Sequence, residues 1–170
     1  MDILFTIMVT YFVSIILGWG VHLLLHCKIF GYPFYKFHLL AHHRKKFIAN
    51  PLDLNLYNII EHLVWLTFYA LFLLIFYLIL PPLHFWVSSI TFTSYAIVFY
   101  IFHDLIHSKD SFLNQYIWFK KVKSRHLLHH RFAGIIEFKK SLKEECPNIS
   151  FGGPIGGVLL DKLINAYRIK

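Results

Sequence analysis

Long apolar stretches without a single charged side chain dominate this chain. Residues 3–27 contain no Asp, Glu, Lys or Arg, and neither do residues 62–102. A helix of about 20 apolar residues covers the ~30 Å hydrocarbon core of a bilayer. The first stretch therefore predicts one membrane span over residues 3–25.

The second charge-free stretch is too long for one span. Pro81 and Pro82 divide it, because proline cannot donate to a helix ladder and disfavours helix at the residue before it. This predicts two spans, roughly residues 62–80 and 83–102, joined as an antiparallel hairpin. The expected fold is all-α: a single-domain polytopic membrane helix bundle over residues 1–170, with about three transmembrane spans and four as the alternative.

Composition agrees with a membrane protein. Of the 170 residues, 57% are hydrophobic and only 15% are charged, whereas a soluble domain carries about 25% charged residues. This excludes a soluble domain, and the high hydrophobicity excludes a disordered chain. The first stretch is expected to be a span instead of a signal peptide, because no basic residue precedes it and His22 and His26 stand where a small-residue cleavage site is needed.

The basic residues predict the orientation. All 17 Lys and Arg residues lie in segments 27–61 and 103–170, and such residues are enriched in cytoplasmic loops. Three spans put both segments on the cytoplasmic side, as a histidine-rich cap. We interpret the net charge of +8 as topology and attraction to anionic lipid, not nucleic-acid binding. The chain is expected to be an integral membrane protein, of the endoplasmic reticulum if eukaryotic.

Ten of the twelve histidines fall into four clusters at helical spacings. They are His22 and His26; His38, His42 and His43; His103 and His107; and His126, His129 and His130. Residues i, i+3 and i+4 share a face of a helix, so three of the clusters can each point their imidazoles in one direction. The cluster at His38 needs an irregular turn or π-bulge for all three rings to converge.

All four clusters are expected at one level, because they lie at the cytoplasmic ends of spans or in cytoplasmic segments. A first-row metal ion takes four to six ligands, so ten imidazoles predict two ions. The simpler alternatives are interfacial histidines or a proton relay, but burying so many imidazoles without a shared cation leaves many polar groups unpaired. We expect all ten to be metal ligands, with no further catalytic residue. The isolated His84 is expected to be structural or interfacial, and His62 to support a ligand or to pack, instead of binding metal.

Four histidine motifs and one later segment carry a resemblance to a known family. In chain order they are the HxxxH beginning at His22, the HxxxHH beginning at His38, the HDxxH beginning at His103, the HxxHH beginning at His126, and residues 148–152 followed by Asp161. They resemble the fatty acid hydroxylase and sterol desaturase superfamily of integral membrane di-iron oxygenases, which includes carotenoid hydroxylase-like members. Leu160 stands where the family has tryptophan.

The resemblance implies two iron ions that activate O2 to hydroxylate an unactivated C–H bond of a lipid, with a fatty acyl chain as the favoured substrate. Carotenoid hydroxylation, or sterol oxidation or desaturation by the same centre, stays open. Zinc binds more tightly than ferrous iron, so purified protein can hold zinc instead. Asp104 and Glu61 are expected to orient the imidazoles through hydrogen bonds.

The chain is expected to need a separate electron donor. It has no GxGxxG motif for a flavin or nicotinamide, and Cys27 and Cys146 are too few for an iron–sulfur cluster. The resemblance suggests a cytochrome b5-like or ferredoxin-like donor with an NAD(P)H reductase, and a lipid substrate taken from the bilayer.

A non-enzymatic membrane protein that binds or transports metal is the alternative from another class. A transporter would place its histidines through the depth of the spans, and a bis-histidine haem protein would need facing pairs near mid-membrane. Neither pattern is present in this sequence.

Overall fold

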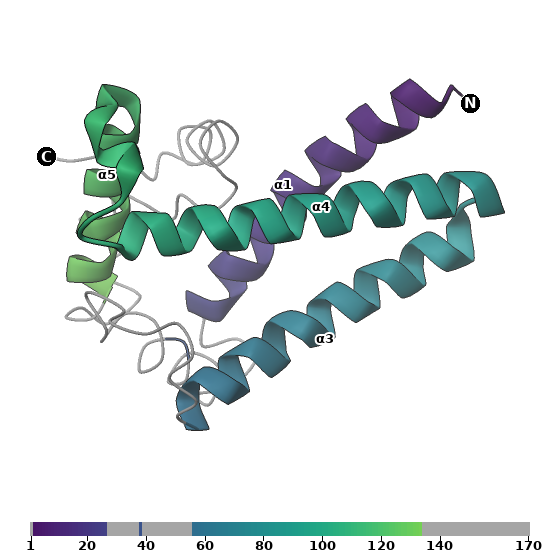
Figure 1. The fold of residues 1–170 in the computed structure, drawn as a ribbon. Coiled ribbons are helices and arrows are strands. Elements are labelled where there is room, and N and C mark those ends of the chain that lie inside the picture. Colours follow the sequence, from purple (N-terminus) through teal and green to yellow (C-terminus); the bar gives the residue numbers. More distant parts are fainter. Residues whose placement is uncertain (1, 27–37, 39–55, 134–170) are drawn as a thin grey trace, which may run out of the picture.

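The computed structural model describes residues 2–26, residue 38 and residues 56–133, and this part of the chain is helical throughout, without strands. Its elements are α1 (Ile3–His26), α3 (Leu56–Ile79), α4 (Pro82–His107), the 3-10 helix η3 (Phe112–Gln115) and α5 (Ile117–Ala133), drawn in Figure 1. Among the described residues, α1, α3 and α4 are long and apolar enough to cross a membrane. The expected all-α fold with three membrane-length helices is confirmed.

The two prolines separate α3 from α4, as predicted. Pro81 has extended backbone angles (φ −57°, ψ 152°) and precedes α4, and Pro82 is the first residue of α4, where a missing N–H costs nothing. The helix α4 continues past residue 102, the expected end of the third span, and ends at His107. No Gly or Pro interrupts this extension, so the helix ends only where Ser108 turns to extended backbone angles (φ −71°, ψ 131°).

Hydroxyl groups join α1 to α4. The Thr6 hydroxyl lies 2.8 Å from Nδ1 of His84, and the hydroxyls of Thr10 and Ser88 lie 2.9 Å apart. The Ser14 hydroxyl donates to the main-chain oxygen of Thr10 over 2.6 Å. Inside a bilayer, water does not compete for these groups, so polar side chains must find partners within the protein. Spaced four residues apart on α1, they form one seam along the helix pair.

Aromatic side chains join α3 to α4. The rings of Tyr69 and Phe92 stack with their centroids 5.3 Å apart, and the Tyr69 hydroxyl contacts that of Thr93. The outer faces remain apolar and exposed, as at Leu78 on α3 and Ile90 on α4. A helix that is apolar on all sides but largely exposed is typical of contact with lipid.

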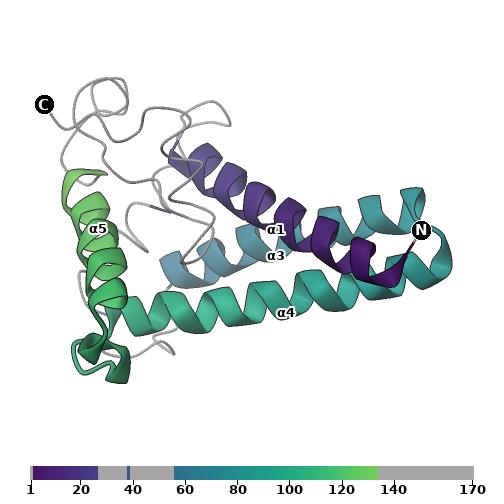
Figure 2. The ribbon, with the colours of Figure 1, turned by 90° about the horizontal axis from the view of Figure 1, so that it is seen from above.

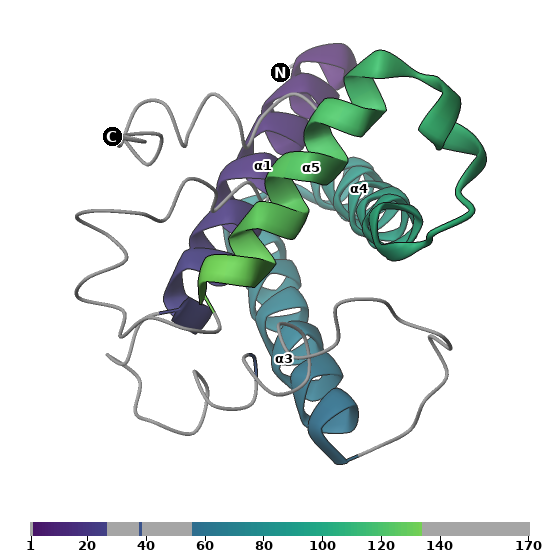
Figure 3. The ribbon, with the colours of Figure 1, turned by 90° about the vertical axis from the view of Figure 1, so that its left-hand side faces the viewer.

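The C-terminal ends of α1 and α4 and the N-terminal end of α3 lie toward one end of the molecule (Figures 1 and 2). We call this the histidine end, because α4 carries His103 and His107 there, and the opposite end, around the proline turn, the far end. Helix α5 runs across the histidine end instead of continuing α4 (Figure 3). Its Phe119 is fully buried and meets Phe102 of α4 edge-on, with centroids 5.6 Å apart.

Candidate metal centre

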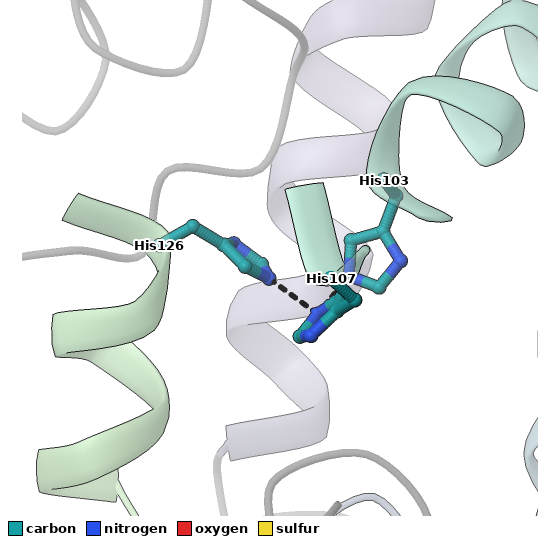
Figure 4. Close-up of side chains that lie close together, drawn as sticks. All are labelled: His103, His107 and His126. Atoms are coloured by element: carbon teal, nitrogen blue, oxygen red, sulfur yellow. Dashed lines mark hydrogen bonds between the residues drawn. The ribbon is translucent and has the colours of Figure 1, made fainter. Parts of the chain in front are cut away.

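Three histidines from two helices converge at the histidine end. His103 and His107 are four residues apart on α4, so they share a face of that helix, and His126 reaches them from α5 (Figure 4). One ring nitrogen from each lies within 4.8 Å of the other two. Nε2 of His107 is 3.2 Å from Nε2 of His103 and 3.0 Å from Nε2 of His126.

Hydrogen bonds account for only some of the close contacts between the ring nitrogens of these three histidines. A ring nitrogen of neutral imidazole carries either one hydrogen or one lone pair. Nε2 of His107 faces two nitrogens at once, so only one of the two contacts can be a good hydrogen bond. A metal cation would accept all three lone pairs, and each ring would then keep its proton on Nδ1.

The distances between the nitrogens fit a shared ion. Metal–nitrogen bonds of about 2.1 Å put two ligand nitrogens about 3.0–3.4 Å apart at bond angles of about 90–109°. Both measured contacts of His107, 3.0 and 3.2 Å, lie in that range. The three histidines are therefore close enough to bind one metal ion.

Burial favours the neutral form of His126, the form that a metal ligand needs. His107 and His126 are only 1% and 2% exposed. Burial lowers the pKa of His126 well below its usual value, and the neighbouring His107 and His38 lower it further. A neutral imidazole offers the lone pair that a metal ion needs.

Two more of the predicted ligands are buried nearby, with His38 close to His126 and His22 beside His38. His22, near the end of α1, and His38 are 1% and 3% exposed, and their ring centroids are 5.2 Å apart. His38 is also close enough to disfavour a positive charge on His126. The structure thus brings together residues from the first, second, third and fourth histidine clusters.

The side chains of the other five predicted ligands lie outside the described residues. They are His26, His42, His43, His129 and His130. The side chain of Glu61, one of the two acids expected to orient the ligands, also lies outside them. The other acid, Asp104, lies between His103 and His107 in sequence and interacts electrostatically with His62 of α3.

Of the two isolated histidines, only His84 is shown to be remote from the three converging rings. His84 is at the far end, bonded to Thr6, and 19 residues of continuous helix separate it from His103, about 28 Å at 1.5 Å per residue. The ring of His62 contacts Tyr100 across α3 and α4, with centroids 6.1 Å apart.

One polar group near the site went unrecognised in the sequence. The Lys123 side chain donates a hydrogen bond to the main-chain oxygen of Ser108, the residue that follows His107. Lys123 stands three residues before His126. Among several lysines in a basic segment, nothing in the sequence distinguishes it, apart from its spacing of one helical turn from a predicted ligand.

Comparison of the chain with family models, curated proteins and solved structures finds no match.

Proposed function

We propose that this protein is a membrane di-iron oxygenase that hydroxylates an unactivated C–H bond of a lipid, most simply of a fatty acyl chain. The observation that carries the proposal is the convergence of His103, His107 and His126 at the end of a membrane-length helix. His22 and His38, buried beside them, supply further nitrogen ligands from separate parts of the sequence.

The donor set favours a transition metal. The three converging ligands are all imidazoles, which suit iron, copper and zinc, whereas calcium and magnesium prefer oxygen ligands. The choice of iron, and of two ions, comes from the resemblance of the four histidine motifs to the fatty acid hydroxylase and sterol desaturase superfamily. Zinc would compete for the same nitrogens in purified protein, because it binds more tightly than ferrous iron.

The location of the three histidines suits an apolar substrate. They lie at the end of α4, whose outer face is apolar, with Ile97 and Ile101 more than half exposed. A lipid chain in the bilayer would thus reach the site without crossing water. Bound iron would supply the redox chemistry that activates O2, and the buried imidazoles would hold the ions away from bulk solvent.

Two electrons per turnover would come from a separate donor. Inserting one oxygen atom of O2 into a C–H bond leaves the other atom to be reduced to water, which consumes two electrons and two protons. Lys109, Lys120 and Lys121 are exposed near the histidine end and would attract an acidic carrier such as a cytochrome b5-like or ferredoxin-like protein. The excess of Lys and Arg in residues 27–61 and 103–170 would put the histidine end on the cytoplasmic side of the membrane.

The decisive experiment is expression of the full chain in a host with varied lipids, followed by mass spectrometry of the lipid extract. The proposal predicts products heavier by one oxygen atom that are absent with His107→Ala and present with His84→Ala. A product lighter by two hydrogens would instead indicate desaturation. Bound metal without any lipid product would favour the metal-binding or transport alternative.

A further inference from the structure

One lysine side chain ties together the turn between α4 and α5. Lys123, on α5, donates from Nζ to the main-chain oxygen of Ser108 over 2.5 Å and to Oδ1 of Asn114 over 3.1 Å. Ser108 is the residue directly after α4, and Asn114 belongs to η3. The Lys123 ammonium group therefore links three elements: the end of α4, the short helix η3 and α5.

The acceptor on Asn114 is itself held in place. Its Nδ2 donates to the main-chain oxygen of Lys109 over 2.8 Å, and its main-chain N–H donates to that of Ser111 over 2.9 Å. The Ser111 hydroxyl in turn caps η3 by accepting from the N–H of Leu113. The Nδ2 bond and the main-chain bond of Asn114 are thus both made within the turn, which fixes the position of its Oδ1 as the acceptor for Lys123.

The bonds from Lys123 are of the stronger kind. Hydrogen bonds from a charged donor are roughly twice as strong as neutral ones, and the last carbonyls of a helix carry partial negative charge. Partial burial lowers the pKa of Lys123, against the opposing effect of Asp110. An ammonium group that is partly shielded from water depends on its protein acceptors. The oxygens of Ser108 and Asn114 therefore stabilise this position of the Lys123 side chain.

The position of Lys123 connects the turn to the metal centre. Ser108 directly follows His107, and Lys123 stands one helical turn before His126. The two histidines bring their Nε2 atoms within 3.0 Å of each other. Elsewhere, α5 meets α4 where Trp118 stacks on Phe102 and Phe119 meets it edge-on, and hydrogen bonds depend on direction more steeply than such apolar contacts do.

We propose that Lys123 is a positioning residue of the metal centre, which by bonding Ser108 and Asn114 sets where His126 stands relative to His107. The proposal rests on the metal centre proposed above. Metal–nitrogen bonds are about 2.0–2.1 Å long, so a movement of α5 by about 1 Å takes His126 out of bonding distance. Residues that hydrogen-bond a metal ligand directly change metal affinity by about 10–100-fold, and Lys123, which acts through the backbone and Asn114, is expected at the lower end of that range.

The test is a titration of metal-free, full-length protein in lipid nanodiscs with Co²⁺, followed by its ligand-field absorption. Lys123→Met is expected to weaken Co²⁺ binding about tenfold and to shift the absorption bands, and Lys123→Arg, which keeps a charged donor, to restore most of both. The matched control is Lys121→Met, an exposed lysine on the same helix, which is expected to bind as the wild type does. Wild-type affinity and bands in Lys123→Met would overturn the proposal.

A second variant covers the case in which Lys123→Met does not insert into the membrane. Asn114→Ala keeps the lysine but removes its anchor, and it is expected to weaken Co²⁺ binding by a smaller factor. Unchanged binding in Asn114→Ala would then overturn the proposal in the same way.

A distance measurement separates this proposal from that of the metal centre. Spin labels at Ile101→Cys and Ser124→Cys, with Cys27 and Cys146 replaced by serine, report the spacing of α4 and α5 without metal. Lys123→Met is expected to broaden the distribution of label distances, and an unchanged distribution counts against the proposal. A wild type that binds no Co²⁺ while Lys123→Met still broadens the distances would reject the metal centre but retain the link from Lys123 to α5.

Discussion

The two ends of the bundle use polar side chains in opposite ways. At the far end, each polar group of the α1–α4 seam has a local partner, as Thr6 has in His84 and Thr10 in Ser88. At the histidine end, Nε2 of His107 lies close to two other ring nitrogens but can form a good hydrogen bond with only one of them. The first arrangement is complete as a helix contact, whereas the second would be completed by a bound cation. Polar residues near a membrane therefore indicate a functional site when they exceed what pairing requires.

Alanine substitution at each end tests this difference most strongly. His107→Ala removes the nitrogen shared by both contacts and is expected to abolish metal binding and lipid oxidation. His84→Ala removes one hydrogen bond at the far end, about 0.6 kcal/mol for such bonds between membrane helices, and should leave both properties intact. Metal content of purified protein and product analysis measure the two effects. Equal damage from the two substitutions would remove the distinction between the ends.

Metal removal should weaken the histidine end alone. At a free metal concentration of 100 times Kd, a bound ion adds about 2.7 kcal/mol to the free energy of unfolding. We expect a chelator to lower the melting temperature of the wild-type protein accordingly, measured by tryptophan fluorescence. The double variant His103→Ala/His107→Ala serves as the control, and its melting temperature should not respond to metal. A response of equal size in that variant would locate the stabilising ion elsewhere.

Acid should destabilise the metal-free protein through His126. Its folded-state pKa lies below the unfolded value of about 6.5, so below pH 6.5 the unfolded chain binds a proton that the folded chain rejects. The free energy of unfolding is therefore unaffected above that pH, and it falls by up to about 1.4 kcal/mol for each unit below it. Unfolding of the metal-free protein at pH 7.5 and 5.5 measures this, and His126→Gln is expected to reduce the pH dependence. An undiminished dependence in His126→Gln would assign it to another group.

The smallest expected effect lies in the seam at the far end. Thr10→Val keeps the shape of the side chain but removes its hydroxyl, leaving the Ser88 hydroxyl without this partner. A loss of about 0.6 kcal/mol in the free energy of unfolding is expected, with Co²⁺ affinity unchanged. Reversible unfolding in mixed detergent micelles measures the first quantity, and a titration of the same sample measures the second. Weaker Co²⁺ binding would mean that the seam also shapes the metal centre.

The parts of the fold that follow from local rules were predictable from the sequence. Charge-free stretches and the Pro81–Pro82 pair predicted three membrane-length helices and the boundary between α3 and α4, and both are confirmed. The spacing of His103 and His107 predicted that they share a face of one helix, and the two rings do converge. Helical periodicity and the effect of proline on the backbone depend only on residues close together in the chain, so both can be predicted from the sequence.

Features that depend on tertiary contacts were not predictable. The exact end of α4 is one example, because the histidine spacing predicted helix as far as His107 but no Gly or Pro marks where the helix stops. The course of α5 across the histidine end is another, since it follows from the burial of Phe119 against Phe102. The role of Lys123 requires knowledge of both, because its acceptor Ser108 stands 15 residues away in sequence.

The supply of ligands from distant parts of the chain sets an order of events during biosynthesis. His22 is synthesised before His126 by about a hundred residues, an interval of about 5–20 s at 5–20 residues per second. In that time α1 and α4 can already pair through the hydroxyls of Thr10 and Ser88, which need no metal. The last of the three converging histidines arrives only with α5, so a nascent chain that stops short of α5 lacks one of the three rings. Metal binding at these rings would therefore follow the placement of the membrane helices.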